Sequence, residues 1–342
     1  MQIGGSPCTY WSIAQTSNRE TEPSGMGWEL FENYLIALEK FKPNFFLYEN
    51  NKSMSAAIRA EITKRFGFEP VCINSALVSA QNRQRLYWCG KRNPDGTYSA
   101  VPVQQPEDKG ILLRDILESG IQMQEKSYCL TATEYKGSNV KNTVTKHRRT
   151  MIAEPVRIGT IESKVKNADF DSQQYRVYSS HVPNVIQDVN KNPVKSRPVY
   201  EVKNGLITIN GKQYSIKLAD GFYIIRKLTV TECKRLQTVP DNYVFPVSDT
   251  QAYKMLGNGW TVDVIAHILS HCHGIASEPL DVLSMYDGMA CGHIALDKLG
   301  AHISRYCASE IDKYAIKTAC HNFPGIEQIG DAFQVREPNW KV

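Results

Sequence analysis

The sequence predicts an α/β fold with a mostly parallel sheet and a second, smaller β-rich region. Residues 1–94 and 282–342 alternate short apolar runs with helix-like segments, a pattern typical of parallel sheets. Between them, residues 95–225 carry polar runs, isolated Gly and Pro, and short β-like pieces. The 342 residues, 42% of them hydrophobic, are enough for one large domain and a smaller one.

The first region is predicted to alternate helices and strands. Apolar residues recur at helical spacing up to Phe41 and stop before Pro43, which marks the end of a helix. Ser53 or Ser55 is a candidate N-cap for the next helix, and Gly67 is its stop. In order, we expect a helix over 28–41, a strand over 45–48, a helix over 53–66 and a strand over 85–89.

The β-rich region is predicted to contain at least one hairpin. Short strand-like pieces cover 176–178, 205–209 and 213–216. Asn210-Gly211 lies between the last two, and this dipeptide favours a tight hairpin turn.

The remaining chain returns to helices and then to a second α/β pattern. Thr229 and Glu232 match a capping box at the start of a helix over 229–236, and a second helix is expected over 261–271. A linker, 274–281, precedes a strand, a Gly-containing turn and a helix over 294–299. A strand over 306–311, another helix and a last short strand ending near Asp331 follow.

Composition limits the class of protein only broadly. The net charge of +5 permits an anionic partner without requiring one. The nine cysteines form no CxxC pair, so we expect no metal site and free thiols in a reducing, cytoplasmic setting. No signal-like N-terminus and no apolar run of about 20 residues is present, so no membrane span is expected.

Four residues in the first region are candidates for catalysis. Cys8 follows Gly4-Gly5-Ser6-Pro7, a turn that places a nucleophile at the carboxyl edge of a sheet. Glu49 closes an apolar run, where it is either an acid that acts on a substrate or a structural carboxylate in a cap or ion pair. Arg83 and Arg85 alternate along a strand and therefore share one face. They bind a carbonyl or phosphate, orient the acid, or form surface salt bridges.

Three successive strand ends near the end of the chain predict a nucleoside cofactor site. Residues 281–292 run from a strand through a Gly-containing turn into a helix, which lets backbone approach a ligand. Glu310 stands about twenty residues further on, a spacing that suits ribose hydroxyls. Asp331 ends the third strand, where its carboxylate can accept from an adenine amino group.

These motifs together resemble the cytosine-5 DNA methyltransferase family over most of the chain. The matching segments are 4–12, 48–50, 81–85, 226–241, 253–262 and 286–292, with Glu310 and Asp331. The resemblance implies a Rossmann-like S-adenosylmethionine-dependent methyltransferase fold with a target-recognition region at 95–225. It implies Cys8 as nucleophile, Glu49 as partner of cytosine N3, and Arg83 and Arg85 as active-site arginines. It places nine residues near S-adenosylmethionine: Tyr286, Asp287, Gly288, Gly292, Glu310, Ile311, Asp331, Asn258 and Trp260.

The implied reaction explains why these residue types occur together. Cytosine C5 becomes nucleophilic only when a thiolate adds at C6 and an acid stabilises the proton on N3. The base must leave the double-stranded DNA helix to reach the cofactor. Two other functions remain open: a tRNA cytosine-5 methyltransferase with similar motifs, and a DNA-binding protein that has lost catalysis. A cognate restriction enzyme is a further possible partner.

A basic cluster within 95–225 has two interpretations. Lys141, Lys146, His147, Arg148 and Arg149 form either a solvated loop or an insertion that faces DNA.

The order of the motifs differs from that of the family. The cofactor-like part, 282–331, comes last instead of first, so we expect a circular permutant in which 274–281 connects the usual ends. Thr9-Tyr10-Trp11 and Gly259-Trp260 also depart from the usual motifs, and they are nearer to eukaryotic de novo DNA methyltransferases and some phage-like enzymes.

Overall fold

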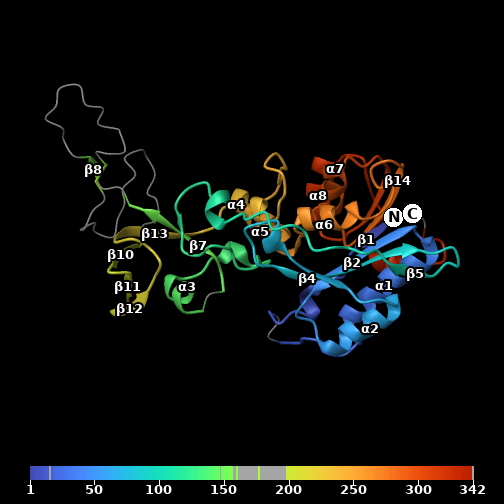
Figure 1. Cartoon of the computed structure of the whole chain (residues 1–342), viewed down its shortest axis with the longest axis horizontal. Helices are drawn as coiled ribbons and strands as arrows, with labels where there is room; N and C mark the ends of the chain where they lie inside the picture. The colour runs from blue at the N-terminus through green and yellow to red at the C-terminus, as the bar shows by residue number, and fades with distance from the viewer. Residues whose placement is uncertain (15–16, 147, 157–158, 161–175, 178–197, 341–342) are drawn as a thin grey trace, which may run out of the picture.

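The protein consists of a large α/β body and a small β-rich unit, and several segments of the chain connect the two (Figure 1). We analysed a computed structural model, which describes residues 1–14, 17–146, 148–156, 159–160, 176–177 and 198–340. No helix in these ranges is long and apolar enough to cross a membrane.

The large sheet brings the first and last parts of the chain together. Its strand order is β16-β15-β14-β1-β2-β4-β3, with β5 paired to β4. The pairs from β16 to β2 are parallel, and β4 runs antiparallel to β2, β3 and β5. The expected mostly parallel sheet is therefore confirmed. The strands are β1 (Gln2–Gly4), β2 (Phe45–Asn51), β3 (Val71–Asn74), β4 (Gln84–Arg92), β5 (Tyr98–Ala100), β14 (Leu280–Met285), β15 (Ile303–Ser309) and β16 (Ile326–Gln328).

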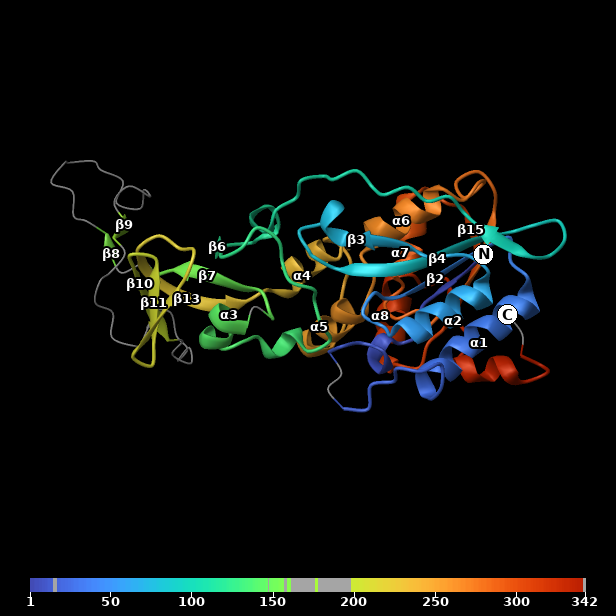
Figure 2. The same ribbon diagram turned by 60° about the horizontal axis from the view of Figure 1, so that its bottom comes forward.

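Helices cover both faces of this sheet because its strands alternate buried side chains to either side. Phe46 and Tyr48 belong to the cluster with side chains of α1 and α2, whereas Ile3 and Leu47 belong to the cluster that contains α6 and α7. Figure 2 shows these two pairs of helices on opposite faces of the sheet. The helices are α1 (Met26–Phe41), α2 (Ala56–Phe66), α6 (Val262–Ser270), α7 (Cys291–Lys298) and α8 (Lys313–Asn322).

The helix boundaries expected from the sequence are largely confirmed. Ser55 is the N-cap of α2, where its side chain accepts from the Ile58 N–H at 3.2 Å, and Gly67 ends the helix with φ of 83°. Thr229 and Glu232 form the expected capping box of α4 (Val230–Leu236). The helical pattern did not predict α5 (Asp249–Asn258) as a separate helix.

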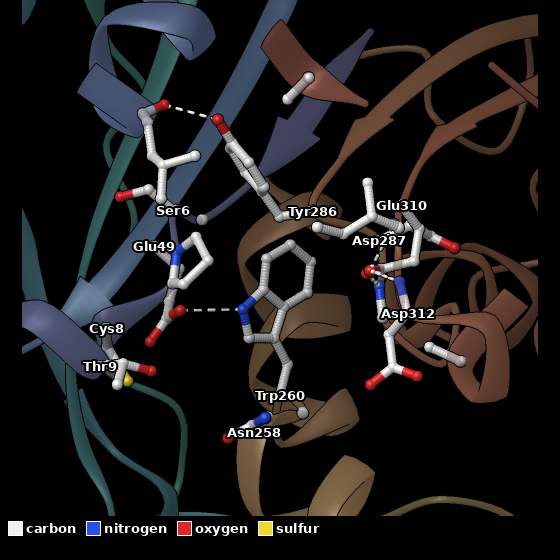
Figure 3. Close-up of a pocket in the computed structure, with 18 of the residues that line it drawn as sticks. Ser6, Cys8, Thr9, Glu49, Asn258, Trp260, Tyr286, Asp287, Glu310 and Asp312 are labelled. Carbon is white, nitrogen blue, oxygen red and sulfur yellow. Dashed lines mark hydrogen bonds between the residues drawn. The ribbon is translucent and has the colours of Figure 1, made fainter. Parts of the chain in front are cut away.

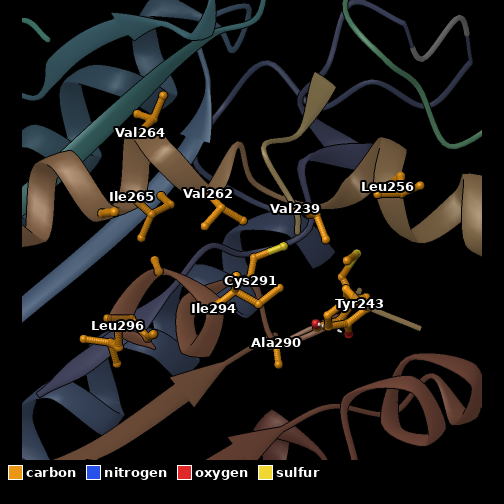
Figure 4. Packing of buried hydrophobic residues seen from close by; sticks show 14 of the residues in the cluster. Val239, Tyr243, Leu256, Val262, Val264, Ile265, Ala290, Cys291, Ile294 and Leu296 are labelled. Atoms are coloured by element: carbon orange, nitrogen blue, oxygen red, sulfur yellow. Dashed lines mark hydrogen bonds between the residues drawn. The ribbon is translucent and has the colours of Figure 1, made fainter. Parts of the chain in front are cut away.

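The helices α6 and α7 hold the two halves of the body together. Figure 4 shows apolar side chains of the two helices facing each other, with Val239, Tyr243 and Leu256 beside them. From α6 these are Val262 and Ile265, and from α7 they include Cys291 and Ile294. Val264 and Leu296 belong to the same cluster, with Val264 on the side of α6 away from α7.

The small unit is a six-stranded antiparallel sheet of order β12-β11-β10-β13-β7-β6, with a two-stranded pair β8-β9. The hairpin at Asn210-Gly211 is confirmed, and both residues have positive φ, 51° and 75°. The strands are β6 (Ile121–Gln122), β7 (Met151–Pro155), β8 (Gly159–Thr160), β9 (Arg176–Val177), β10 (Val199–Lys203), β11 (Leu206–Ile209), β12 (Lys212–Ser215) and β13 (Gly221–Lys227). Only β9 falls on the expected 176–178 piece, whose last residue lies outside the described residues.

Short helical turns complete the chain: η1 (Cys8–Tyr10), η2 (Ser75–Leu77), η3 (Leu113–Ile116), η4 (Glu134–Lys136), η6 (Ala332–Arg336) and the helix α3 (Val140–Lys146). Residues such as Val101, Leu113 and Ile116 belong to the core of the large body. Strand β13 also runs across the boundary expected at 225/226. The small unit therefore begins later in the chain than residue 95, and it ends after residue 225.

Candidate active site

One pocket of about 480 Å³ lies at the carboxyl edge of the large sheet (Figure 3). It is bounded by the loops after β1, β2, β14, β15 and β16 and by the end of α5. The carboxyl ends of parallel strands in an open α/β sheet are the usual place for a ligand. All the site residues expected from the sequence line it, except Gly292.

The loop that carries Cys8 is fixed by close backbone approach. A Cβ atom on Gly5 would stand 2.5 Å from the Glu49 carbonyl oxygen, so only glycine fits between the ends of β1 and β2. The Ser6 hydroxyl lies 2.6 Å from the Tyr48 hydroxyl, and the Asn50 amide donates to the Ser6 carbonyl at 3.1 Å. These contacts hold Cys8 beside Glu49.

Cys8 begins the turn η1, and the chain after it is anchored. The Trp11 and Ser12 N–H groups both donate to the Cys8 carbonyl, at 3.1 and 3.0 Å. Trp11 is fully buried, and its indole donates to Glu20 at 3.1 Å. Burial raises the pKa of the Cys8 thiol, although the charges of Arg85 and Arg83 act in the opposite direction. Burial therefore favours the neutral thiol over the thiolate.

The Glu49 carboxylate is held at both oxygens. Arg85 Nε lies 3.1 Å from Oε1, and both side chains are about nine-tenths buried, with 14% and 12% exposed. Trp260 Nε1 donates to Oε2 at 2.9 Å. The ion pair is one of the structural roles expected for Glu49, and it also places the acid at the pocket wall.

The guanidinium of Arg83 is occupied by backbone. Nη1 donates to the Leu130 carbonyl at 3.1 Å, and Nη2 donates to the carbonyls of Gly257 and Gly259 at 3.2 and 2.8 Å. Its side chain also contacts Cys129, whose sulfur lies 3.3 Å from Nη1. Arg83 lines the pocket, but Nη1 binds the backbone at Leu130 and Nη2 binds the backbone at the end of α5.

On the other side of the pocket, the turn after β14 is tight. Tyr286 and Gly288 have φ of 60° and 62°, both in the left-handed region. The Asp287 Oδ1 atom accepts from the Ser284 hydroxyl at 2.6 Å and the Tyr306 hydroxyl at 2.7 Å. Its Oδ2 atom is buried and has no hydrogen-bond partner in the part of the chain that the structure describes, and burial raises the pKa of Asp287 to about 7.

Two further carboxylates stand at the next strand ends. Glu310 follows β15; its Oε2 accepts from the Gly288 N–H at 2.8 Å, and Oε1 from the N–H groups of Ile311 and Asp312. Asp331 caps η6 by accepting from the Phe333 N–H at 3.0 Å. Expected strands over 306–311 and up to 331 end earlier, at Ser309 and Gln328, so both carboxylates lie in loops.

Gly292 is placed away from the pocket, contrary to its expected role. It lies inside α7, where a Cβ atom would stand 2.2 Å from the Ile3 Cδ1 atom. The glycine therefore allows α7 to pack on the sheet and does not touch a ligand site.

The structure also adds lining residues that the sequence motifs did not show. Lys254 on α5 pairs with Asp312 at 2.8 Å across the pocket rim. Asp312 is the N-cap of α8, a position that the start of the helical pattern at 313 could have revealed. Within the described ranges, no group of three or more His, Cys, Asp or Glu side chains is arranged to hold a metal ion.

Known proteins match most of this chain. The model of the family described as C-5 cytosine-specific DNA methylase matches residues 1–274. The type II methyltransferase M1.ScrFI of Lactococcus lactis subsp. cremoris is 26% identical over 295 residues, covering 82% of this chain and 62% of that protein. The type II methyltransferase M.FnuDI of Fusobacterium nucleatum is 24% identical over 282 residues, covering 78% and 74%. The matched part thus spans less than two thirds of the first relative.

A solved structure is also similar. The Entamoeba histolytica methyltransferase EhMeth has a TM-score of 0.41 and 12% sequence identity, over 79% of this chain and 75% of that one.

Proposed function

The chain belongs to the C-5 cytosine-specific DNA methylase family, and from this membership we propose that it methylates cytosine C5 in double-stranded DNA. Enzymes of this family take the methyl group from S-adenosylmethionine. The observation that carries the proposal is that one pocket is lined by Cys8 and Glu49 on one side and by Asp287 and Glu310 on the other (Figure 3). Nucleophile and cofactor-type residues thus meet at one edge of the sheet.

The first side of the pocket supplies the chemistry on the base. The Cys8 thiol gives up its proton as its sulfur bonds to C6 of a flipped cytosine, N3 takes up a proton, and the Glu49 carboxylate accepts a hydrogen bond from the resulting N3–H. This addition gives C5 the character of an enamine carbon, which takes the methyl group. A base then removes the C5 proton, and the bond between Cys8 and C6 breaks.

The second side suits the cofactor. S-adenosylmethionine supplies a methyl group on a sulfonium, which is activated for transfer to carbon. The unpartnered Asp287 oxygen and the carboxylates of Glu310 and Asp331 are acceptors that match its ammonium, ribose hydroxyl and adenine amino donors. We assign Tyr286, Gly288, Ile311 and Asn258 to the same binding site because they line this side of the pocket.

The small β-rich unit is assigned to target recognition. Lys141 and Lys146 on α3, and Arg148 after it, are exposed, as expected for phosphate contacts. Arg149 instead donates to the Gly137 carbonyl and to the Thr133 hydroxyl. The basic cluster therefore combines exposed side chains with one that forms hydrogen bonds within the fold. His147 lies outside the described residues.

We further propose that the motif order is circularly permuted. Strands β14, β15 and β16 come last in the chain, yet β14 pairs with β1 in the middle of the sheet. The family match stops at residue 274, before these strands. A collinear match cannot include a segment that has moved to the other end of the chain.

Two other properties follow from the relatives. M1.ScrFI and M.FnuDI are named type II methyltransferases, so we propose a role in restriction–modification with a cognate restriction enzyme. A cytoplasmic setting is part of the same proposal, and all nine cysteines are free thiols in this structure.

The test is transfer of tritiated methyl from S-adenosylmethionine to unmethylated duplex DNA and, separately, to tRNA. We expect label on DNA that disappears in Cys8→Ser, and bisulfite sequencing will locate the target. Label on tRNA alone would move the chain to an RNA substrate. DNA binding without label on either substrate would contradict an active enzyme and favour a binding protein.

A further inference from the structure

Trp260 stands between the two sides of the pocket (Figure 3). Its indole lies between Glu49 and the group formed by Asp287 and Glu310, and its N–H points to Glu49. The hydrogen bond from Nε1 to Glu49 Oε2 is 2.9 Å long, within the normal range. Trp260 therefore touches the proposed acid from the side on which the cofactor is expected.

The backbone that carries Trp260 is fixed from two directions. Arg83 donates to the Gly259 carbonyl at 2.8 Å, and the Gln237 amide donates to the same oxygen at 3.1 Å. Gly257 lies so close to Thr131 that an added Cβ atom would stand 2.2 Å from its backbone. The turn has little freedom, so the indole N–H is aimed before any substrate binds.

Glu49 is also fixed, but only one oxygen is held by charge. Its backbone lies in β2 opposite Tyr87 of β4, and Arg85 engages Oε1. The other oxygen, Oε2, has the indole N–H as donor. A carboxylate oxygen can accept hydrogen bonds in two directions, so Oε2 can accept from the indole N–H and still accept from a cytosine ring.

We propose that Trp260 is a positioning residue that orients the Glu49 carboxylate for its contact with the cytosine ring. Arg85 and Trp260 act as two clamps, one on each oxygen, and together they fix the plane of the carboxylate. This role rests on the proposed function, and it differs from a simple contact of Trp260 with the cofactor.

The two roles separate in a Trp260→Phe variant, which keeps an aromatic ring and removes the N–H. If the indole orients Glu49, kcat falls about ten-fold or more, as for a lost hydrogen bond to a charged group, and the KM for S-adenosylmethionine changes little. If Trp260 is only a wall of the cofactor site, the KM rises and kcat stays, which would overturn the proposal.

A double-mutant cycle with Glu49→Gln sharpens the result. Because Trp260 acts through Glu49, Trp260→Phe should change kcat by less than two-fold when Glu49 is already Gln. Equal losses in both backgrounds would contradict the proposal. Trp28→Phe is the matched control, since Trp28 Nε1 also donates to a carboxylate, Glu32 Oε1 at 3.2 Å, and lies outside the pocket. Its kcat should match that of the wild type.

A spectroscopic measurement makes the test independent of methylation. The chain has five tryptophans, and ¹⁵N labelling gives each indole N–H its own resonance. The signal missing in Trp260→Phe identifies Trp260, and we expect Glu49→Gln to shift it while the Trp28 signal stays in place. An unmoved Trp260 signal would refute the contact. An inactive wild type with the expected shift would refute the proposed function and leave the contact established.

Discussion

Asp287 is a buried carboxyl group whose two oxygens have different surroundings. Oδ1 accepts from two hydroxyls, whereas the buried Oδ2 has no hydrogen-bond partner among the described residues; the residue as a whole lines the pocket. Burial is the main reason that the pKa rises to about 7, and the nearby charge of Glu310 adds to it. Ionisation of this buried carboxyl group is costly, and a positive charge on a ligand bound beside it would offset that cost.

The raised pKa makes the stability of the ligand-free protein depend on pH. The pKa in the folded state lies above the ordinary aspartate value of 3.8, so protonation favours folding. The favourable contribution is complete below the unfolded pKa and is lost as the pH rises through about 7. We expect the melting temperature of the wild type to fall, relative to Asp287→Asn, by a few degrees between pH 5 and 8. A constant difference across this range in thermal scans would contradict the buried, ionisable Asp287.

A substitution at Gly5 tests the placement of Cys8, the proposed nucleophile. In Gly5→Ala the new Cβ would meet the Glu49 carbonyl oxygen at 2.5 Å and must push the Cys8 loop away. A shift of about 1 Å can cost about 100-fold in rate, so we expect methyl transfer to fall by that order. Gly325→Ala is the control, because a Cβ there has no atom within 4 Å. Equal activities of the two variants would show that the loop tolerates the shift.

At the scale of elements, a buried ion network joins the small sheet to the large body. Arg226 on β13 donates to both oxygens of Glu232 on α4, at 2.8 Å each, and to Glu154 on β7 at 2.6 Å. The Glu232 side chain is fully buried. Burial alone would raise the pKa of Glu232, but the bonds from Arg226 and from backbone N–H groups lower it overall.

Removal of Arg226 should therefore be costly. Arg226→Met leaves the Glu232 charge buried without its partner, which typically costs about 3–5 kcal/mol. We expect urea unfolding to show a loss of this size, and Arg226→Met/Glu232→Gln to recover part of it because no uncompensated charge remains. A loss below about 1 kcal/mol would mean that water reaches Glu232.

At the scale of the whole molecule, each end of the described chain is anchored to a segment distant in sequence, the first residue to β14 and the last residues to α1. The Met1 amino group donates to the Asp281 carbonyl at 2.6 Å, so β1 is held by β14 from its first residue. Near the other end, Lys40 on α1 donates to the Val335 and Glu337 carbonyls, and Phe41 packs against Trp340. The two ends lie near each other in Figures 1 and 2.

This arrangement predicts that the order of the two halves can be reversed. A variant in which 275–342 precedes Met1 through a short flexible linker should keep the same sheet, since every strand pair is preserved. We expect a melting temperature within a few degrees of the wild type and retained methyl transfer to DNA. A control that places 275–342 first but lacks the linker should be less stable. An unfolded linked variant would count against the permutation.

Much of the local structure follows from the sequence by itself. The amphipathic pattern ending before Pro43 gave α1, Ser55 and Gly67 bounded α2, and Asn210-Gly211 formed the hairpin. These features depend on neighbouring residues, so a single chain encodes them locally. The positions of α5 and of the short strands β6 and β7 depend on packing between distant segments and were not predicted.

The sequence also determined which residue types meet, because Cys8, Glu49, Glu310 and Asp331 were each predicted at or near the end of a strand, and strand ends share one edge of a parallel sheet. Only the tertiary structure decided what each side chain contacts. It turned Arg83 onto backbone carbonyls, buried Gly292 against Ile3, and placed the Trp260 N–H on Glu49. Those contacts join residues far apart in the chain, some by more than 200 positions, so their geometry exists only after the sheet has formed.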